Sequence, residues 1–205
     1  MLRLYRARFS TNVERVALAL AHKGLAAESV VISYEDRSPV VEVSGQRLVP
    51  VLVDGDDVIP DSTRILRHLE SRWPDPPLFP RDASRRAELD VFLDWFNEVW
   101  KLAPNAIEEE LERDQPDQDR IVPHAARMRA SLELFEAMLD GRDHLFGDDF
   151  SAADCAAFPF LKYAKLREPA DDELFHRILE DNLRLDGSHP RLSAWIDRVN
   201  ARPRA

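Results

Sequence analysis

The N-terminal part of the chain alternates short apolar runs with stretches of helical periodicity. Residues 12–23 place apolar side chains at helical spacing, and Gly24 then stops the helix. Residues 48–59 hold two apolar runs around a turn-forming Asp-Gly-Asp-Asp tetrad, which predicts a hairpin. The full pattern predicts a strand at 2–5, a helix at 12–23, a strand at 29–33, a short helix at 38–44, a hairpin at 48–59 and a helix from Asp61 or Ser62 to about Ser71.

The C-terminal part carries only helical patterns and is set off by a proline-rich segment. Residues 73–82 contain four prolines, and each removes an amide donor and disfavours helix at the preceding residue. We therefore expect an N-terminal domain at 1–73, a linker at 74–83 and an all-helical domain at 84–205. The helices expected in the second domain are 84–112, 121–140, 152–166, 171–182 and 190–201.

The order of these elements indicates a fold class. A strand–helix–strand unit followed by a hairpin and a helix is the arrangement of a thioredoxin-like α/β domain with a mixed four-stranded sheet. The helices that follow have no strands to cover, so they predict a separate all-α bundle.

Composition and charge restrict the possible partners. The chain has 205 residues, and 28 basic against 38 acidic side chains give a net charge of −10. An acidic surface repels phosphate backbones and anionic lipid, so neither nucleic acid nor membrane is an expected partner. The single cysteine, Cys155, excludes an internal disulfide. No segment approaches the ~20 apolar residues of a membrane helix and the N-terminus lacks a signal-peptide core, so we expect a cytoplasmic protein.

The proline at the start of the hairpin is a candidate binding feature. Pro50 opens a strand, where proline is tolerated only at an edge or at the first position. A cis Val49–Pro50 bond would turn the amide and carbonyl of Val49 outward, where they could pair with an extended peptide. An ordinary trans proline at the strand entry is the alternative.

Two helix starts carry further candidates. Asp61, Ser62 and Thr63 can cap the helix that they begin, and the same groups could hold an ammonium and a carboxylate of an amino-acid head. Ser10 and Thr11 stand at the start of the helix at 12–23. A hydroxyl there can stabilise an anion such as a thiolate, although these residues considered alone favour plain capping of the helix.

Four motifs in register carry a family resemblance over essentially the whole chain. They are LYRARFSTNVERVALALAHKGL, LVPVLVDGDDVI followed by DSTRILRHLE, FSAADCAAFPFL and HPRLSAWIDRVNARP. With these motifs the chain resembles the cytosolic glutathione transferases. Ser151 and Asp154 have the form of a capping box in the helical domain. Cys155 beside them is expected to be a buried apolar residue.

The resemblance implies a role for each matched residue. Ser10, with Thr11 as a possible partner, takes the position that faces the thiol of glutathione. Val49 before Pro50 matches the residue whose backbone pairs with the cysteinyl unit. Asp61 and Ser62 match the acidic residue and serine that hold the γ-glutamyl head, with no metal involved. Tyr5 lies too early in the chain for a tyrosine-type mechanism and is expected to pack in its strand.

The resemblance also implies partners. They are glutathione as co-substrate, a hydrophobic electrophile in an interdomain cleft, and a second copy of the chain in a homodimer active in detoxification. The candidate cleft walls, which helical spacing equally assigns to a core, are Phe9, Phe92, Trp95, Phe96 and Trp100.

Two departures from the family pattern keep alternatives open. Asp61 is one methylene shorter than the usual Glu, and the loop from Gly45 to Val49 is longer than usual. The residue that meets the glycine carboxylate is therefore open among Arg37, Gln46 and Arg47. A transferase that uses another low-molecular-weight thiol, and a non-catalytic binding or scaffold protein, remain the alternatives to a glutathione-dependent enzyme.

Overall fold

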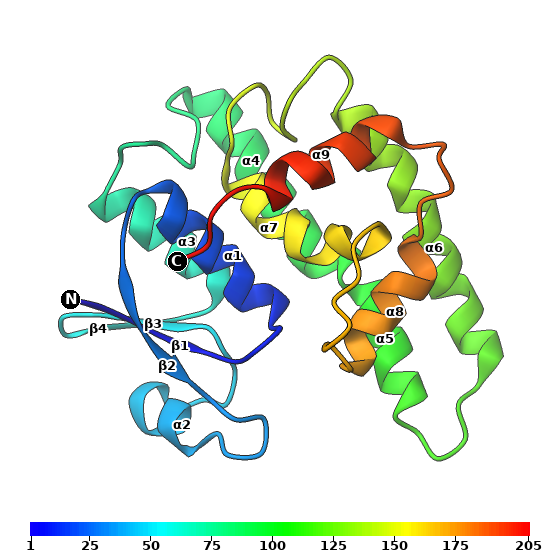
Figure 1. Cartoon of the computed structure of the whole chain (residues 1–205), viewed down its shortest axis with the longest axis horizontal. Helices are drawn as coiled ribbons and strands as arrows, with labels where there is room; N and C mark the ends of the chain where they lie inside the picture. The colour runs from blue at the N-terminus through cyan, green and yellow to red at the C-terminus, as the bar shows by residue number, and fades with distance from the viewer. The chain divides into compact units, whose positions relative to one another are not determined.

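A computed structural model describes all 205 residues and divides them into two compact units (Figure 1). The first, here called the sheet unit, comprises residues 1–83 together with the C-terminal residues 202–205. The second, the helical unit, comprises residues 84–201. No helix combines the length and the apolar character that crossing a bilayer requires.

The sheet unit is built on a four-stranded mixed sheet, as the sequence predicts. The strand order is β2-β1-β3-β4, in which β1 and β2 are parallel and the other neighbours are antiparallel. Gly55, with a φ of 63°, makes the tight turn between the last two strands. The strands are β1 (Leu2–Arg6), β2 (Ala27–Val31), β3 (Val51–Asp54) and β4 (Asp57–Pro60).

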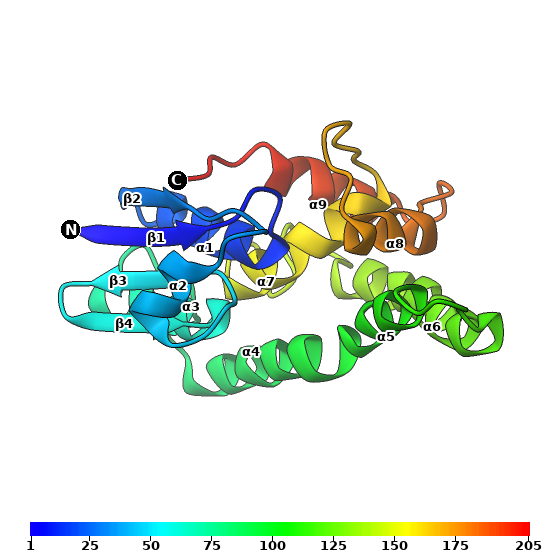
Figure 2. The ribbon, with the colours of Figure 1, turned by 90° about the horizontal axis from the view of Figure 1, so that it is seen from below.

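Helices cover both faces of this sheet. The helices α1 (Thr11–His22) and α3 (Ser62–Arg72) lie on one side, and α2 (Ser38–Ser44) lies on the other (Figures 1 and 2). Because side chains alternate across a strand, one strand residue packs against α1 and α3 and the next packs against α2. Tyr5 packs in the cluster with Val40 of α2, which confirms its expected role in strand packing.

The helical unit contains six α-helices. They are α4 (Ala83–Trp95), α5 (Leu102–Leu111), α6 (Gln118–Met138), α7 (Ala152–Leu161), α8 (Leu174–Leu183) and α9 (Pro190–Asn200), and α4 begins one residue before the unit does. The helix expected at 84–112 is divided by a π-helical segment at Phe96–Trp100. The rings at the two ends of that segment stack with centroids 4.6 Å apart, so the wider turn lets both enter the core.

Two other predicted helices differ at their ends. The helix expected at 152–166 gives way after Leu161 to a 3₁₀ turn at Lys162–Ala164. The helix expected at 171–182 begins only at Leu174. Asp171 instead accepts hydrogen bonds from Tyr163 and from the amide of Glu173, and these hold the preceding loop in a non-helical turn.

The capping box at the start of α7 is present, as predicted. The carboxylate of Asp154 is fully buried and accepts hydrogen bonds from the amides of Ser151 and Leu145 and from Nε1 of Trp195, at 2.9, 3.1 and 2.8 Å. Cys155 is also fully buried, as expected. This box therefore ties one helix start to the core of the helical unit.

The last residues of the chain belong to the sheet unit. Arg204 pairs with Glu14 of α1 at 2.9 Å, and the amide of Ala205 donates to the carbonyl of Ala17 at 3.1 Å. The terminal residue also accepts a hydrogen bond from Arg6 at the end of β1. The tail thus fastens to the helix that carries Ser10 at its start.

Candidate active site

Strand register brings three separate segments to one end of the sheet. Tyr5 near the end of β1 pairs with Val51 at the start of β3, and Val51 pairs with Pro60 at the end of β4. The segment after β1, the segment before β3 and the segment after β4 therefore meet at the end opposite the first residue (Figure 1). These segments carry Ser10 and Thr11, Val49 and Pro50, and Asp61 and Ser62.

Ser10 caps α1 and keeps its proton available. Its side-chain oxygen accepts a hydrogen bond from the amide of Val13 at 3.4 Å, and the residue is half-buried. A hydroxyl that accepts one bond can still donate its own hydrogen to another group. Since the start of α1 also carries partial positive charge, Ser10 can stabilise an anion placed before the helix.

Thr11 is placed differently from Ser10. It is the first residue of α1 and only 5% exposed. Its side chain therefore has little surface to offer a ligand at the sheet end. Of the two predicted hydroxyls, the geometry favours Ser10 as the one that meets a bound thiol.

The loop before β3 presents the backbone of Val49. The Val49–Pro50 bond is cis, which is one of the two alternatives that the sequence left open, and a second cis bond joins Asp75 and Pro76 in the proline-rich segment. Val49 lies outside the sheet register, which begins at Val51, so its amide and carbonyl take no part in the ladder. An extended ligand can pair with these groups.

The candidates for a glycine carboxylate have different surroundings in the structure. Gln46 uses its amide within its own loop, where it donates to the carbonyl of Leu48 at 2.7 Å and accepts from the amide of that residue. Arg47 is exposed. The guanidinium of Arg37 lies 4.6 Å from the ring centroid of Tyr34. The arginines thus retain donors that Gln46 has already used.

Asp61 and Ser62, at the start of α3, accept hydrogen bonds from different partners. Asp61 is exposed, has a φ of 77° and accepts a hydrogen bond from the amide of Arg64 at 2.9 Å. A positive φ is uncommon for a residue with a side chain, and Asp is among those that adopt it most readily. Ser62 is only 3% exposed, and its hydroxyl accepts a hydrogen bond from Arg15 at 3.4 Å.

Arg15 is a residue that the sequence reasoning missed. It lies within α1, is 1% exposed and connects that helix to the start of α3 through Ser62. A buried guanidinium is costly unless it is paired, so its place beneath two helix starts indicates a positioning role. The sequence feature that could have identified Arg15 is its position as a charged residue among the mostly apolar residues of this helix.

The turn that delivers Ser10 has an uncommon backbone. Phe9 has a φ of 60°, which a non-glycine residue adopts only at an energetic cost of order 1–3 kcal/mol. Arg8 places its guanidinium 4.6 Å from the centroid of the Phe9 ring. Nothing in the local sequence indicates this turn, because phenylalanine does not favour a positive φ.

Three of the five aromatic residues expected to line a ligand cleft form part of a core instead, whereas Phe9 and Trp95 are half-buried. Phe92, Phe96 and Trp100 are buried in the helical unit. Phe96 is fully buried and also contacts Phe135 and Phe160 edge to face. This is the alternative that their helical spacing left open.

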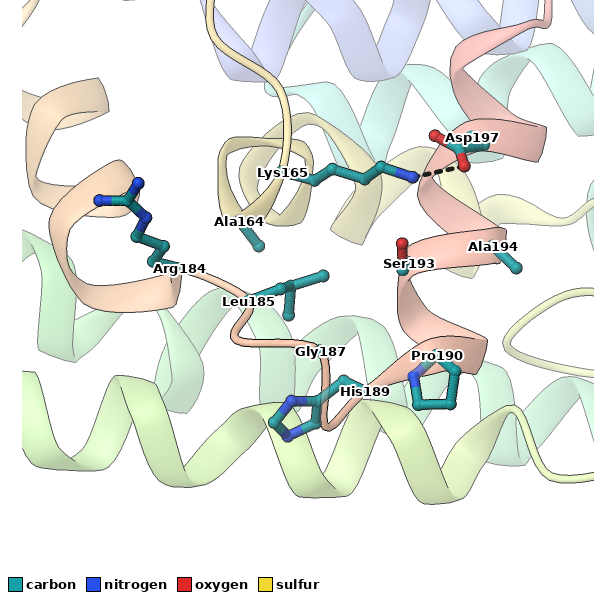
Figure 3. A pocket seen from close by; sticks show the side chains of 10 residues that line it. All are labelled: Ala164, Lys165, Arg184, Leu185, Gly187, His189, Pro190, Ser193, Ala194 and Asp197. Atoms are coloured by element: carbon teal, nitrogen blue, oxygen red, sulfur yellow. Dashed lines mark hydrogen bonds and ion pairs between the residues drawn. The ribbon is translucent and has the colours of Figure 1, made fainter.

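A pocket of about 570 Å³ lies in the helical unit, beside the start of α9 (Figure 3). Lys165 reaches across it to form an ion pair with Asp197. Leu185 points toward Ser193, whereas Arg184 points away from the hollow (Figure 3). Lys165 and Asp197 neutralise each other, and none of the sequence-predicted site residues lines this pocket. The candidate site therefore remains the end of the sheet.

Comparisons with known proteins match both units of the chain to one family. A family model described as glutathione S-transferase, N-terminal domain, matches residues 4–77, and one described as glutathione S-transferase, C-terminal domain, matches residues 93–198. Glutathione S-transferase 3 of Zea mays is 30% identical over 98% of this chain and 90% of its own length. FtsZ-localized protein A of Caulobacter vibrioides is 30% identical over 72% of this chain and 70% of its own. A solved glutathione S-transferase from Rhodospirillum rubrum F11 has a TM-score of 0.78 and 27% identity, covering 99% of this chain and 89% of that one.

Proposed function

Because the chain belongs to the glutathione S-transferase family, we propose that it binds glutathione at the Ser10 end of its sheet and activates the thiol for attack on a small electrophile. The observation that carries this proposal is the convergence of Ser10, Val49 and Asp61 at that end through the register of three strands. Each of the three offers the polar group that one part of the tripeptide requires.

Ser10 stabilises the ionised thiol in this proposal. Its hydroxyl hydrogen donates to the sulfur, and the start of α1 adds partial positive charge behind it. Both interactions favour the thiolate over the thiol, so the thiol proton leaves to solvent at a lower pH. The thiolate then attacks the electrophilic carbon, a carbon–sulfur bond forms and the leaving group departs. No covalent bond to the protein is made.

The other two segments hold the tripeptide in place. The backbone of Val49 pairs with the cysteinyl unit, and Asp61 accepts a hydrogen bond from the ammonium of the γ-glutamyl head. The amides at the start of α3 meet the neighbouring carboxylate, and Ser62, which is only 3% exposed and bonded to Arg15, supports this helix start from within the unit. Holding the thiol in one orientation adds to catalysis because it lowers the entropic cost of the reaction.

Two measurements test the proposal together. Glutathione at millimolar concentration should raise the melting temperature, since a ligand that binds only the folded state stabilises it. The protein should also accelerate the reaction of glutathione with 1-chloro-2,4-dinitrobenzene above the uncatalysed rate. A chain that shows neither effect contradicts the proposed function.

A second candidate function is a binding or scaffold protein with a transferase fold. It is favoured by the similarity to FtsZ-localized protein A, whose name describes a location and not a reaction. Stabilisation by glutathione without conjugation of any aryl halide would favour this alternative. Stabilisation by a different small thiol, but not by glutathione, would keep the transferase chemistry and change its co-substrate.

We further propose a homodimer in the cytoplasm, on the strength of the family alone. Sedimentation that finds only a monomer of about the chain mass, 23.5 kDa, at micromolar concentrations would contradict the dimer.

A further inference from the structure

Two arginines at the ligand end of the sheet unit are held by aromatic rings and not by carboxylates. Arg8 follows β1 and stacks on Phe9, and Arg37 precedes α2 and stacks on Tyr34, each with its guanidinium 4.6 Å from the ring centroid. Neither forms an ion pair with a carboxylate of the sheet unit. Stacking uses the flat face of a guanidinium and leaves the N–H groups at its rim able to bind an anion.

The two stacks form one connected structure. The hydroxyl of Tyr34 donates to the carbonyl of Arg8 at 2.8 Å, so the loop after β2 is fastened to the loop after β1. Arg8 is two residues from Ser10, which keeps their Cα atoms within about 7.6 Å of each other. The backbone of Arg8 is therefore close to the residue whose hydroxyl faces the thiol in the proposed function.

Two exposed carboxylates of the sheet unit accept hydrogen bonds from their own turns. Asp36 accepts hydrogen bonds from the hydroxyl and the amide of Ser38 at 2.7 and 2.9 Å, and these hold the pKa of Asp36 below its ordinary value. Asp61 accepts from the amide of Arg64. In a chain of net charge −10, arginines that lack an acidic partner beside a candidate site point to an anionic ligand.

We propose that Arg8 binds a negatively charged group on the acceptor substrate, so that the preferred acceptor is a planar electrophile carrying a carboxylate or sulfonate. Phe9 supplies an apolar face beside that charge, and Arg37 strengthens the positive potential. The inference rests on the proposed function. In the reaction tested below, the thiolate sulfur bonds to the aryl carbon, the carbon–chlorine bond breaks, chloride leaves and the thiol proton passes to solvent.

The test compares two acceptors that differ in charge, 4-chloro-3,5-dinitrobenzoate and its methyl ester. Each kcat/KM is divided by the uncatalysed rate constant with glutathione, which removes the difference in intrinsic reactivity. We expect the full chain to favour the acid about three- to tenfold, as for a partly exposed charge-assisted contact. The substitution Arg8→Gln should bring the ratio to about one, Arg8→Lys should retain part of it, and Arg37→Gln should lower it about twofold.

A matched control variant is available at the other end of the unit. Arg72 is also exposed and lies 5.9 Å from the ring centroid of Trp73, but it lies in the last turn of α3 and pairs with Asp54. The substitution Arg72→Gln removes the same charge from the same unit. It should leave the acid-to-ester ratio of the acceptors unchanged.

Arg8 could instead bind the glycine carboxylate of glutathione, which offers the same kind of anionic group. Comparing glutathione with its glycine ethyl ester distinguishes the two. If Arg8→Gln raises the KM for glutathione but not for its ester, and the acceptor ratio does not move, Arg8 binds the tripeptide and the inference is overturned. Equal turnover of acid and ester by the wild-type chain also overturns it, while leaving the proposed function intact. If the chain neither binds glutathione nor turns over either acceptor, both the proposed function and the inference about Arg8 are contradicted.

Discussion

Two helix starts in this protein use the same residue types and differ in how completely their polar atoms are satisfied. At the start of α7, Ser151 and Asp154 are buried, and the carboxylate accepts hydrogen bonds from two amides and an indole. At the start of α3, Asp61 is exposed and accepts one hydrogen bond from its own helix. A serine and an aspartate at a helix start therefore indicate a cap in both units, whereas exposure and unused hydrogen-bonding capacity distinguish the cap that can also bind a ligand.

The largest expected effect is on stability, from Asp154→Ala. Three buried donors would lose their acceptor, at about 1–3 kcal/mol each, so the free energy of unfolding should fall by about 3 kcal/mol or more. Asp61→Ala should cost less, about 1 kcal/mol for the lost exposed cap with a small addition for alanine at a positive φ. Urea denaturation of both variants makes the comparison. If Asp154→Ala does not fold, Asp154→Asn keeps one acceptor oxygen and should show an intermediate loss. Equal losses from the two alanine variants would show that the two starts do not differ as described.

The next effect is on rate, from Ser10→Ala. A hydrogen bond to a charged group contributes roughly 1.5–3 kcal/mol, and one pKa unit is about 1.4 kcal/mol. Removing the hydroxyl should therefore raise the pKa of the bound thiol by about one to two units and slow conjugation near neutral pH by roughly ten- to a hundredfold. A pH–rate profile measures both. Thr11→Ala is the matched control, and a profile that moves with Thr11→Ala but not with Ser10→Ala would transfer the role to Thr11.

A smaller effect should appear in binding, from the exposed cap itself. Asp61→Ala removes the acceptor for the γ-glutamyl ammonium, and we expect the Kd for glutathione to rise about tenfold, the low end of the range for hydrogen bonds to charged groups because Asp61 is exposed. The pKa of the bound thiol should change little, since Ser10 is intact. Calorimetric titration gives the Kd. An unchanged Kd with a shifted pH–rate profile would reverse the roles assigned to Asp61 and Ser10.

Several features of the fold and candidate site could be predicted because their signals are local. The hairpin at 48–59 depends on a turn of four residues, and the box at Ser151 and Asp154 depends on a spacing of three. One proline at a strand entry made a cis Val49–Pro50 bond a candidate but did not decide between cis and trans. Each lies within one stretch of chain, where residue type and conformation are directly coupled. The order of these stretches was then enough to predict the sheet.

The remaining features depend on contacts between distant parts of the chain. Arg15 meets Ser62 across 47 positions, and Tyr34 meets Arg8 across 26. The π-helical segment at Phe96–Trp100 follows from how rings of several helices fit together, which helical spacing within one helix does not reveal. Tertiary packing determines such features, so the sequence pattern could not place them.

The smallest effect is expected from Cys155, the only thiol of the chain. It is fully buried in the first turn of α7, next to Asp154. An alkylating reagent therefore reaches it only when the helical unit opens locally. Labelling should be slow under native conditions and fast in denaturant, and Cys155→Ala should keep kcat/KM within about twofold, because it removes one buried sulfur far in the chain from Ser10. The chemistry in this proposal needs the thiol of the ligand and none from the protein. Rapid native labelling with a proportional loss of activity would contradict that division, since it would place a reactive thiolate in the unit assigned here to packing.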